Sequence, residues 1–183
     1  MLHISRIPVK LRKRLFSPAA GSAGRRDTVC EGMMTTPDEE QLRALLRQAK
    51  TIAIVGAKDK AGQPVDRVGR YLIDAGYRVL PVHPKRTSVW GLPAFPALAD
   101  VGEPVDVVNL FRAPEYCPGH AQEALRLSPL PRLFWMQLGI TSPEAAALLA
   151  RGGVPVVENA CIMVEHARLF GSGERNVQDH SQS

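Results

Sequence analysis

The sequence is poor in the features that mark several large classes of protein. Only three of its 183 residues are cysteines, Cys30, Cys117 and Cys161, and no two of them form a CxxC pair. An odd number of scattered cysteines argues against a disulfide framework or a zinc site, so we expect a reducing, cytoplasmic setting and no metal. No apolar run approaches the roughly 20 residues that a membrane-spanning helix needs, so we expect no membrane segment.

The part of the chain after residue 34 carries no net charge. The formal charge of +5 arises in the first 34 residues, which hold seven basic and two acidic side chains. The other 149 residues hold sixteen of each sign and sum to zero. Because a domain without net charge has no general field to steer it toward a polyanion, we do not expect the folded part to bind nucleic acid.

The two ends of the chain differ in composition from its middle. The basic start is typical of a transit peptide or of untranslated sequence read as protein, and Met33 and Met34, just before a helix start, favour the second. We therefore expect residues 1–34 to be a disordered basic segment or a mis-assigned start. The polar residues 171–183 lack any periodicity, so we expect a disordered tail there.

Residues 35–170 alternate between strand-like and helical patterns and have the length of one domain. Short apolar runs of the kind found in strands buried on both faces occur at 51–57, 78–84, 104–112, 132–139 and 154–160. Repeated strand–helix units form parallel sheets that are covered on both sides. The pattern predicts an α/β fold: a single doubly wound Rossmann-type domain with about five parallel strands and helices on both faces.

Helical spacing falls between these runs. We expect the first helix to have Thr36 as its N-cap and Pro37 as its first residue, and the second to begin at Pro64 and stop at Gly76. Residues 85–102, rich in proline and glycine, are expected to form only a short helix or an extra edge strand. Further helices are predicted near 116–127, 142–152 and 161–169.

The loop after the first predicted strand is a candidate for a phosphate site, because ligands of open parallel sheets bind at the carboxyl ends of strands. At Gly56 the backbone must turn and let a phosphate approach the next helix, so a side chain there is expected to fill the space of a diphosphate. The loop, GAKDKAGQPVDRVG, lacks the GxGxxG spacing of dinucleotide sites. An ordinary turn glycine remains the alternative.

The loop after the second predicted strand, PVHPKR, separates the nucleotides further. NAD sites place Asp or Glu here to bind the ribose diol, whereas His83, Lys85 and Arg86 suit a phosphorylated ribose. NADP and CoA both carry such a phosphate, so the residues alone leave both open. A solvated basic pair without a ligand also remains open.

In order and spacing, these segments resemble the CoA-binding domain family of small single-domain proteins, which is similar to the CoA-binding N-terminal domain of the succinyl-CoA synthetase alpha subunit. The resemblance covers about residues 42–168. It rests on the strings IAIVGA, YLIDAGYRVLPVHPK, VWGLPAFPALADV, PVDVVNLFRAPE, LFWMQLGI and PVVENACIMVE. It implies that the cofactor is CoA, bound as such or as an acyl-CoA.

The resemblance also implies a set of ligand-binding residues, all at the ends of strands. They are Gly56, Ala57 and Lys58 for the diphosphate; His83, Pro84, Lys85 and Arg86 for the adenosine and its phosphate; Phe111 and Arg112 for the adenine or pantetheine; and Gln137 and Gly139 at the border of the same cleft. Two positions depart from the family. Ala57 stands where the family tends to have a hydroxyl residue, and His83 where it tends to have Asn, so each loses or changes one hydrogen bond.

No spacing of nucleophile and base predicts catalysis. Succinyl-CoA synthetases use a phosphorylated histidine in a second domain and an ATP-binding partner chain, and we find neither region in this sequence. We therefore expect a non-catalytic CoA-binding protein with a regulatory, carrier or partner-docking role, the protein partner being unknown. Two alternatives stay open: an NADP-binding oxidoreductase or redox sensor, and an interaction module without a ligand. Cys161, at a predicted helix start, is a candidate for disulfide exchange with CoA.

Overall fold

The fold is described for residues 36–171, in a computed structural model of the protein. The expectations for residues 1–34 and 172–183, and Cys30 with them, lie outside the described residues. Within the described part, no helix combines the length and apolar character that crossing a membrane requires.

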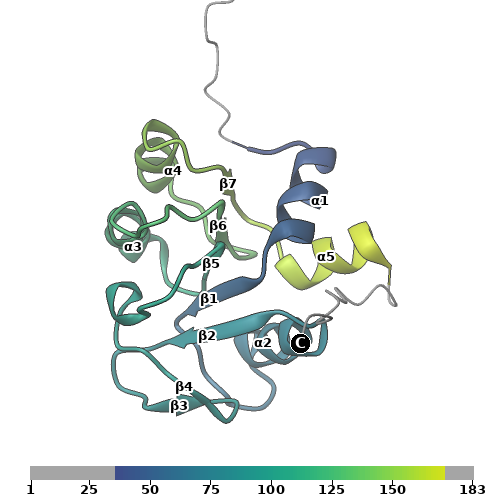
Figure 1. Ribbon diagram of the computed structural model, residues 1–183, viewed down its shortest axis with the longest axis vertical. Helices are drawn as coiled ribbons and strands as arrows, with labels where there is room; N and C mark the ends of the chain where they lie inside the picture. The colour runs from purple at the N-terminus through teal and green to yellow at the C-terminus, as the bar shows by residue number, and fades with distance from the viewer. Residues whose placement is uncertain (1–35, 172–183) are drawn as a thin grey trace, which may run out of the picture. The chain divides into compact units, whose positions relative to one another are not determined.

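Five parallel strands form the main sheet (Figure 1), in the order β2-β1-β5-β6-β7. They are β1 (Thr51–Val55), β2 (Arg78–Val82), β5 (Val107–Leu110), β6 (Leu133–Met136) and β7 (Val156–Val157). Each strand is shorter than the run predicted for it, because buried apolar residues such as Val105 and Val154 lie outside the paired segments. An apolar pattern indicates which residues are buried, and buried residues continue beyond the last residues that pair with a neighbouring strand. The pattern therefore overestimates the length of each strand.

The direction in which strands are added reverses beside β1. The second strand, β2, pairs with one edge of β1, and β5 pairs with the other edge and leads on to β6 and β7. The carboxyl ends of β1 and β5 therefore flank a topological switch point, where doubly wound sheets bind their ligands. The predicted doubly wound parallel sheet is confirmed.

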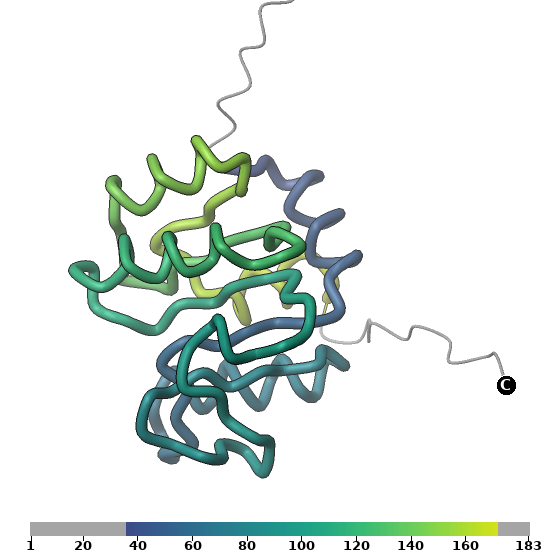
Figure 2. The backbone as a smooth tube through the Cα atoms, turned by 60° about the vertical axis from the view of Figure 1, so that its left-hand side comes forward, coloured from purple at the N-terminus to yellow at the C-terminus, as the bar shows by residue number. Residues whose placement is uncertain are grey.

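Helices cover both faces of the sheet, as predicted. One face carries α1 (Glu39–Gln48), α2 (Pro64–Asp74) and α5 (Ile162–Phe170), and the other carries α3 (Cys117–Ala124) and α4 (Pro143–Arg151). Helices α3 and α4 lie side by side (Figure 2). Alternate residues of each strand enter the two cores, so Ile54 packs under α2 while Val55 faces the opposite way.

The first helix starts later than predicted. Its N-cap is Asp38, so Thr36 and Pro37 lie outside the helix. The side chain of Asp38 accepts a hydrogen bond from the Gln41 N–H at 2.8 Å, and the Gln41 side chain accepts one from the Asp38 N–H at 3.0 Å. This reciprocal capping box satisfies two backbone donors at the start of the helix. The second helix does begin at Pro64.

The segment between β2 and β5 contains both structures that were expected as alternatives. A short hairpin of β3 (Ser88–Val89) and β4 (Leu92–Pro93) is followed by the 3₁₀ helix η1 (Leu98–Asp100), and Phe95 forms a parallel bridge with Val82 of β2. A second 3₁₀ helix, η2 (Pro114–Tyr116), precedes α3.

The tip of this hairpin is fixed to α2 by Trp90. The indole Nε1 of Trp90 donates to the Asp66 carboxylate at 2.8 Å. A Cβ atom at Gly69 would overlap the Trp90 ring, so the ring packs directly on the helix backbone. Trp90 adopts a positive φ of 56°, a conformation that costs energy for a bulky residue and persists where surrounding contacts impose it. We call this contact of Trp90 with Asp66 and Gly69 the hairpin latch.

Candidate functional site

The loops after β1, β2 and β5 lie together at the carboxyl edge of the sheet. The backbone N–H groups of Gly56 and Ala57 donate to the Val82 carbonyl at 2.9 and 3.3 Å, and the Phe111 N–H donates to the Val55 carbonyl at 2.9 Å. The loop after β1 is thus held between the other two. Three segments far apart in the sequence thus meet at the carboxyl edge of the sheet, at the switch point.

The role expected for Gly56 needs correction. Gly56 has a φ of +86°, and a Cβ atom there would lie 2.5 Å from the Phe111 carbonyl oxygen. The space beside this glycine is therefore taken by the backbone of the neighbouring loop, and a side chain at Gly56 would strain the fold itself. Ala57 is fully buried as well, so it shapes the loop from below.

Four cations, contributed by the three loops, lie within electrostatic range of His83. Burial lowers the pKa of His83, and the charges of Arg86, Lys58, Arg112 and Lys85 lower it further. Each of these cations must lie close to the imidazole to act on it, because the interaction falls off with distance. The structure therefore brings together residues predicted from three separate loops. We call Lys58, His83, Lys85, Arg86 and Arg112 the basic cluster.

The imidazole of His83 has a defined hydrogen-bonding role. Its Nδ1 accepts a hydrogen bond from the Lys85 backbone N–H at 3.1 Å. In the neutral ring the proton then resides on Nε2, which is left as a donor. Since the cations around it disfavour a further positive charge, His83 serves as a neutral donor beside four full charges. That combination suits a phosphate, which accepts hydrogen bonds and is anionic.

One carboxylate that the sequence did not indicate joins two of these loops. Asp59 accepts a hydrogen bond from Arg86 Nη1 at 2.6 Å, and the two side chains remain 40% and 36% exposed. An ion pair this exposed contributes only about 0–1 kcal/mol, so a phosphate can displace the carboxylate from Arg86. Asp59 was missed because nothing in a run of alternating charges shows which partner lies 27 residues away.

An aromatic ring lies beside the basic cluster. The guanidinium carbon of Arg112 is 4.7 Å from the centre of the Tyr116 ring, and Tyr116 is 50% exposed. Arginine stacked on an exposed ring forms a flat surface at the edge of a charged site. Tyr116 was not predicted, because a tyrosine just before a helix carries no signal of its own.

The predicted residues at the end of β6 are placed differently. Gln137 is buried, and its Nε2 donates to Oδ1 of Asn109 in the neighbouring strand at 2.8 Å. The Gly139 N–H donates to Oδ1 of Asn159, in the loop after β7, at 2.8 Å. Gln137 therefore lies next to β5, the strand at the switch point. Gly139 is bound to the loop after β7, on the side of β6 that faces away from β5.

Comparison with known proteins decides the family. A family described as a CoA binding domain matches residues 50–167. The chain belongs to the CoA binding domain family. An uncharacterized protein of Bacillus subtilis (strain 168), YneT, is 34% identical over 134 residues, which span 73% of this chain and 98% of that protein. These matches confirm the resemblance drawn from the sequence.

Solved structures from the same comparison agree with the fold. The structure of cell-free ID.343 from Thermus thermophilus has 45% sequence identity and a TM-score of 0.69, covering 73% of this chain and 100% of that one. A hypothetical protein from Pyrococcus horikoshii OT3 has 32% identity and a TM-score of 0.71, covering 75% and 96%. These proteins share the described α/β domain over almost their whole length.

The two departures from the family pattern can now be located. Ala57 is buried and its N–H is bound to Val82, so no hydroxyl is offered to a ligand at this point. His83 keeps Nε2 as its donor within the basic cluster, at the position where the resemblance implies an Asn. Pro84 and Lys85 are exposed beside it. The change at His83 keeps a donor, and the change at Ala57 removes one.

Among the described residues, Cys117 and His166 are buried and Cys161 is partly buried. Cys117 is fully buried, its Sγ donates to the Ala113 carbonyl at 3.7 Å, and burial raises its pKa. His166 is buried in α5 and bonded through Nδ1 to the Tyr71 hydroxyl at 2.9 Å. Cys161 is the N-cap of α5 and packs against the core of the α1–α2–α5 face.

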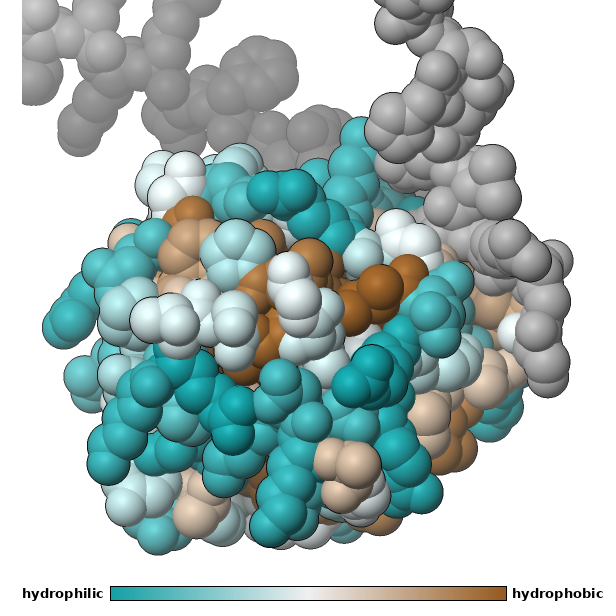
Figure 3. Space-filling model, turned by 90° about the horizontal axis from the view of Figure 1, so that it is seen from below, coloured by the Kyte–Doolittle hydropathy of each residue, from teal (hydrophilic) through white to brown (hydrophobic). Residues whose placement is uncertain are grey.

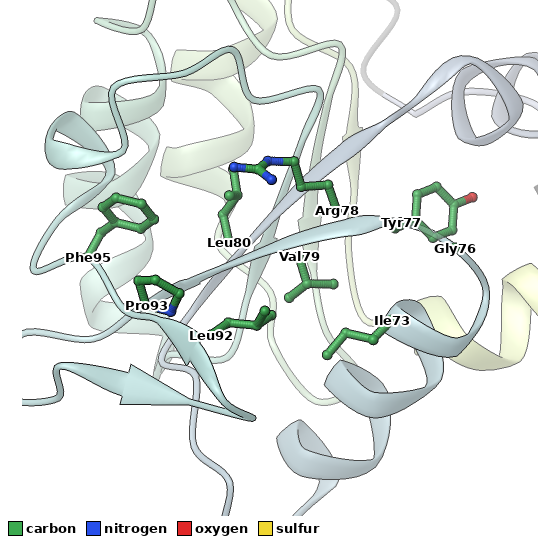
Figure 4. A pocket seen from close by; sticks show the side chains of 9 residues that line it. All are labelled: Ile73, Gly76, Tyr77, Arg78, Val79, Leu80, Leu92, Pro93 and Phe95. Carbon is green, nitrogen blue, oxygen red and sulfur yellow. The ribbon is translucent and has the colours of Figure 1, made fainter. Parts of the chain in front are cut away.

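A hollow of different chemistry opens beside β2. Seen from below the hairpin, hydrophobic side chains are exposed among hydrophilic ones (Figure 3). A groove of about 420 Å³ runs along the free edge of β2, with Ile73, Leu80 and Leu92 among its walls (Figure 4). Its one cation, Arg78, is already bound to Glu103 at 2.6 Å. None of the predicted ligand-binding residues lines this groove, and its chemistry does not suit a phosphate.

Proposed function

We propose that this protein binds CoA or an acyl-CoA at the carboxyl ends of β1, β2 and β5 and catalyses no reaction itself. The observation that carries the proposal is the basic cluster, in which Arg86 pairs with Asp59 of the loop after β1 and four cations from three loops act on His83. Membership of the CoA binding domain family supports CoA as the ligand.

The chemistry of CoA matches the cluster. CoA carries a diphosphate and a separate phosphate on its ribose, so it needs several cations within one crevice. The sequence after β2 supplies a histidine, a lysine and an arginine where an NAD site would carry a carboxylate for the ribose diol. Arg86 can exchange its exposed partner Asp59 for a phosphate oxygen, because charge-assisted bonds to phosphate are strong and often bidentate.

The absence of catalysis is proposed from the placement of reactive groups. The buried thiol of Cys117 has a raised pKa, which disfavours the thiolate that a nucleophile requires. His166 is held by Tyr71 within the core between α2 and α5. In the basic cluster His83 has no carboxylate partner among its hydrogen bonds, only the backbone N–H of Lys85. A binding and regulatory or carrier role fits these positions.

Calorimetric titration of the whole chain with CoA, dephospho-CoA, NADP and NAD tests the proposal. We expect CoA to bind, and dephospho-CoA, which lacks the ribose phosphate, to bind roughly tenfold more weakly or worse. NAD should not bind. Binding of NADP without CoA would replace the proposal by the NADP alternative, and binding of none of the four would leave the interaction module.

A further inference from the structure

In the described part of the chain, one buried side-chain polar atom is left without a partner, and it belongs to β5, a strand whose following loop is part of the candidate site. Among the described residues, Nδ2 of Asn109 is the one buried side-chain nitrogen or oxygen atom with no hydrogen-bond partner. Asn109 is fully buried in β5. Buried polar groups are nearly always paired, because an unpaired one loses the hydrogen bonds that water gave it. An unpaired amide in the middle of a sheet, in a strand that leads to the candidate site, is therefore a candidate for binding part of a ligand.

Strand register places this amide at the switch point. Asn109 pairs with Ile54 of β1 on one side and with Trp135 of β6 on the other. Phe111 follows two residues later, so it points to the same face of the sheet, directly beyond Asn109 toward the carboxyl edge. The amide thus lies under a predicted ligand-binding residue, in the strand that borders the crevice.

Gln137 completes a small polar unit beside it. The Nε2 of Gln137 donates to Oδ1 of Asn109, so the acceptor of Asn109 is used and its donor is not. Both side chains face the α2–α5 side of the sheet among apolar neighbours such as Ile54 and Trp135. We call Asn109 and Gln137 the amide pair. What the amide pair lacks is an acceptor for Nδ2.

The basic cluster and the amide pair define a direction across the crevice. The cluster lies over the ends of β2, β1 and β5, and the amide pair lies between β5 and β6. A ligand with its phosphates in the cluster and its remaining length across the switch point brings its other end over Asn109. The arm of CoA is such an extension, and it carries amide carbonyls, with a thioester carbonyl added in an acyl-CoA.

We propose that the amide pair is a carbonyl subsite, in which Nδ2 of Asn109 donates to a carbonyl oxygen of the CoA arm. This inference rests on the proposed function and adds the direction in which the ligand lies. Phe111 is partly exposed, packs against the same core and follows Asn109 toward the carboxyl edge, so on this proposal it turns aside as the arm enters. Gln137 is the positioning residue, because its bond to Oδ1 fixes the orientation in which Nδ2 is presented.

The double variant Asn109→Leu/Gln137→Met tests the subsite. Replacing both partners by apolar side chains leaves no buried polar atom behind, so we expect a melting temperature equal to or above that of the wild type. Affinity for CoA should fall roughly tenfold, as expected for loss of a buried hydrogen bond. Affinity for adenosine 3′,5′-bisphosphate, which lacks the arm, should not change. Ile54→Val, on the neighbouring strand at the same level, is the matched control and should change neither affinity.

The outcomes separate two sources of the carbonyl. Equal losses for CoA and acetyl-CoA identify an amide of the arm, and a loss for acetyl-CoA alone identifies the thioester; either supports the subsite. An unchanged affinity for both, or an equal loss for the bisphosphate, overturns it. Should the double variant fail to fold, Asn109→Val/Gln137→Met, whose valine suits a strand and offers neither donor nor acceptor, gives the same comparison.

The wild-type protein alone distinguishes failure of this inference from failure of the proposed function. If it binds CoA and the bisphosphate equally well, the arm contributes nothing, and the subsite is overturned while the CoA site stands. If it binds neither, both proposals are overturned.

Discussion

The two faces of the sheet bury different chemistry. Under α3 and α4 the strands present only apolar side chains, namely Ala53, Val55, Leu80, Val82, Val108, Leu110, Phe134, Met136 and Val156. The face under α1, α2 and α5 buries polar groups in both helices and strands: Asp66, Asn109, Gln137 and His166. Burying a polar group costs free energy unless it is paired. The apolar face therefore holds the fold, and the polar face combines that task with the candidate site.

The largest effect expected from this comparison is on the apolar face. Leu149 of α4 is fully buried there. Leu149→Ala should lower the free energy of unfolding by about 2–5 kcal/mol, because it removes buried surface and leaves a cavity. Urea unfolding measures the loss, and titration under native conditions should find the CoA affinity unchanged. A parallel fall in affinity would show that the two faces are not separable.

On the polar face, stability and binding should change together. Gly69→Ala would place a methyl group against the ring of Trp90 and force the hairpin latch open. We expect a loss of about 1–3 kcal/mol in the free energy of unfolding, as for other overpacked sites. The CoA affinity should fall as well, since the latch holds the hairpin that follows residues 83–86. Thermal unfolding and titration measure the two effects.

Gly119→Ala is the matched control for this variant. Gly119 lies in α3, and a Cβ atom there would meet no neighbour within 4 Å. Alanine in an open helical position stabilises by up to about 1 kcal/mol. Equal losses from the two glycine variants would contradict the latch.

A charge reversal in the basic cluster should lower the affinity for CoA without lowering the stability of the fold. Lys85 is exposed, so Lys85→Glu should leave the melting temperature of the free protein nearly unchanged. The CoA affinity should fall at least tenfold, or about 1.4 kcal/mol, through repulsion of phosphate. The loss should be smaller for dephospho-CoA. Arg126→Glu, the same charge reversal just beyond the end of α3, should leave both affinities unaltered, and a Lys85 variant that behaves like it would exclude Lys85 from the site.

The smallest effect expected is a pH dependence of stability from His166. Burial lowers its pKa in the folded state below the ordinary value of 6.5. Its contribution to stability is therefore complete above that value and is lost as the pH falls through the folded pKa. Unfolding at about pH 7.5 and pH 5.5 should show a larger loss for the wild type than for His166→Asn. The pKa of His83 is lowered as well, by burial and by the neighbouring cations, but His83 is present in both proteins, so the difference isolates His166. Equal losses would rule out a contribution from His166.

Most of the fold could be predicted because alternation of strand and helix patterns is local and repeated. The basic cluster could be predicted by type, since Lys85 and Arg86 follow a strand where an NAD site would be acidic. Its geometry could not, because the pair of Arg86 with Asp59 depends on how two loops meet. The start of α1 was misplaced since two caps compete within three residues, and only the bonded partner of Asp38 decides between them.

The amide pair shows a different kind of failure. Asn109 lies within an apolar run, and the sequence gives no reason to separate it from its neighbours. Asn109 stands out only because its Nδ2 has no hydrogen-bond partner. That depends on which side chains the two neighbouring strands, β1 and β6, place beside it. Gly56 shows the opposite failure. The sequence predicts that a glycine is needed there, but the space beside it is occupied by the backbone of Phe111 and not by a ligand.

The position of Trp135 gives the protein an optical probe of its own. Trp135 is fully buried in β6 beside Asn109, and its Nε1 donates to the Ala160 carbonyl at 2.7 Å. The chain has only two tryptophans, and the other, Trp90, forms the hairpin latch and is kept. A change in wild-type emission that is missing from Trp135→Phe therefore belongs to Trp135, and on the proposed subsite it reports Phe111 turning aside as the arm arrives. Mixing CoA, and separately the bisphosphate, with the wild type and with this variant in a stopped-flow instrument would resolve phosphate capture and arm entry as two steps in time.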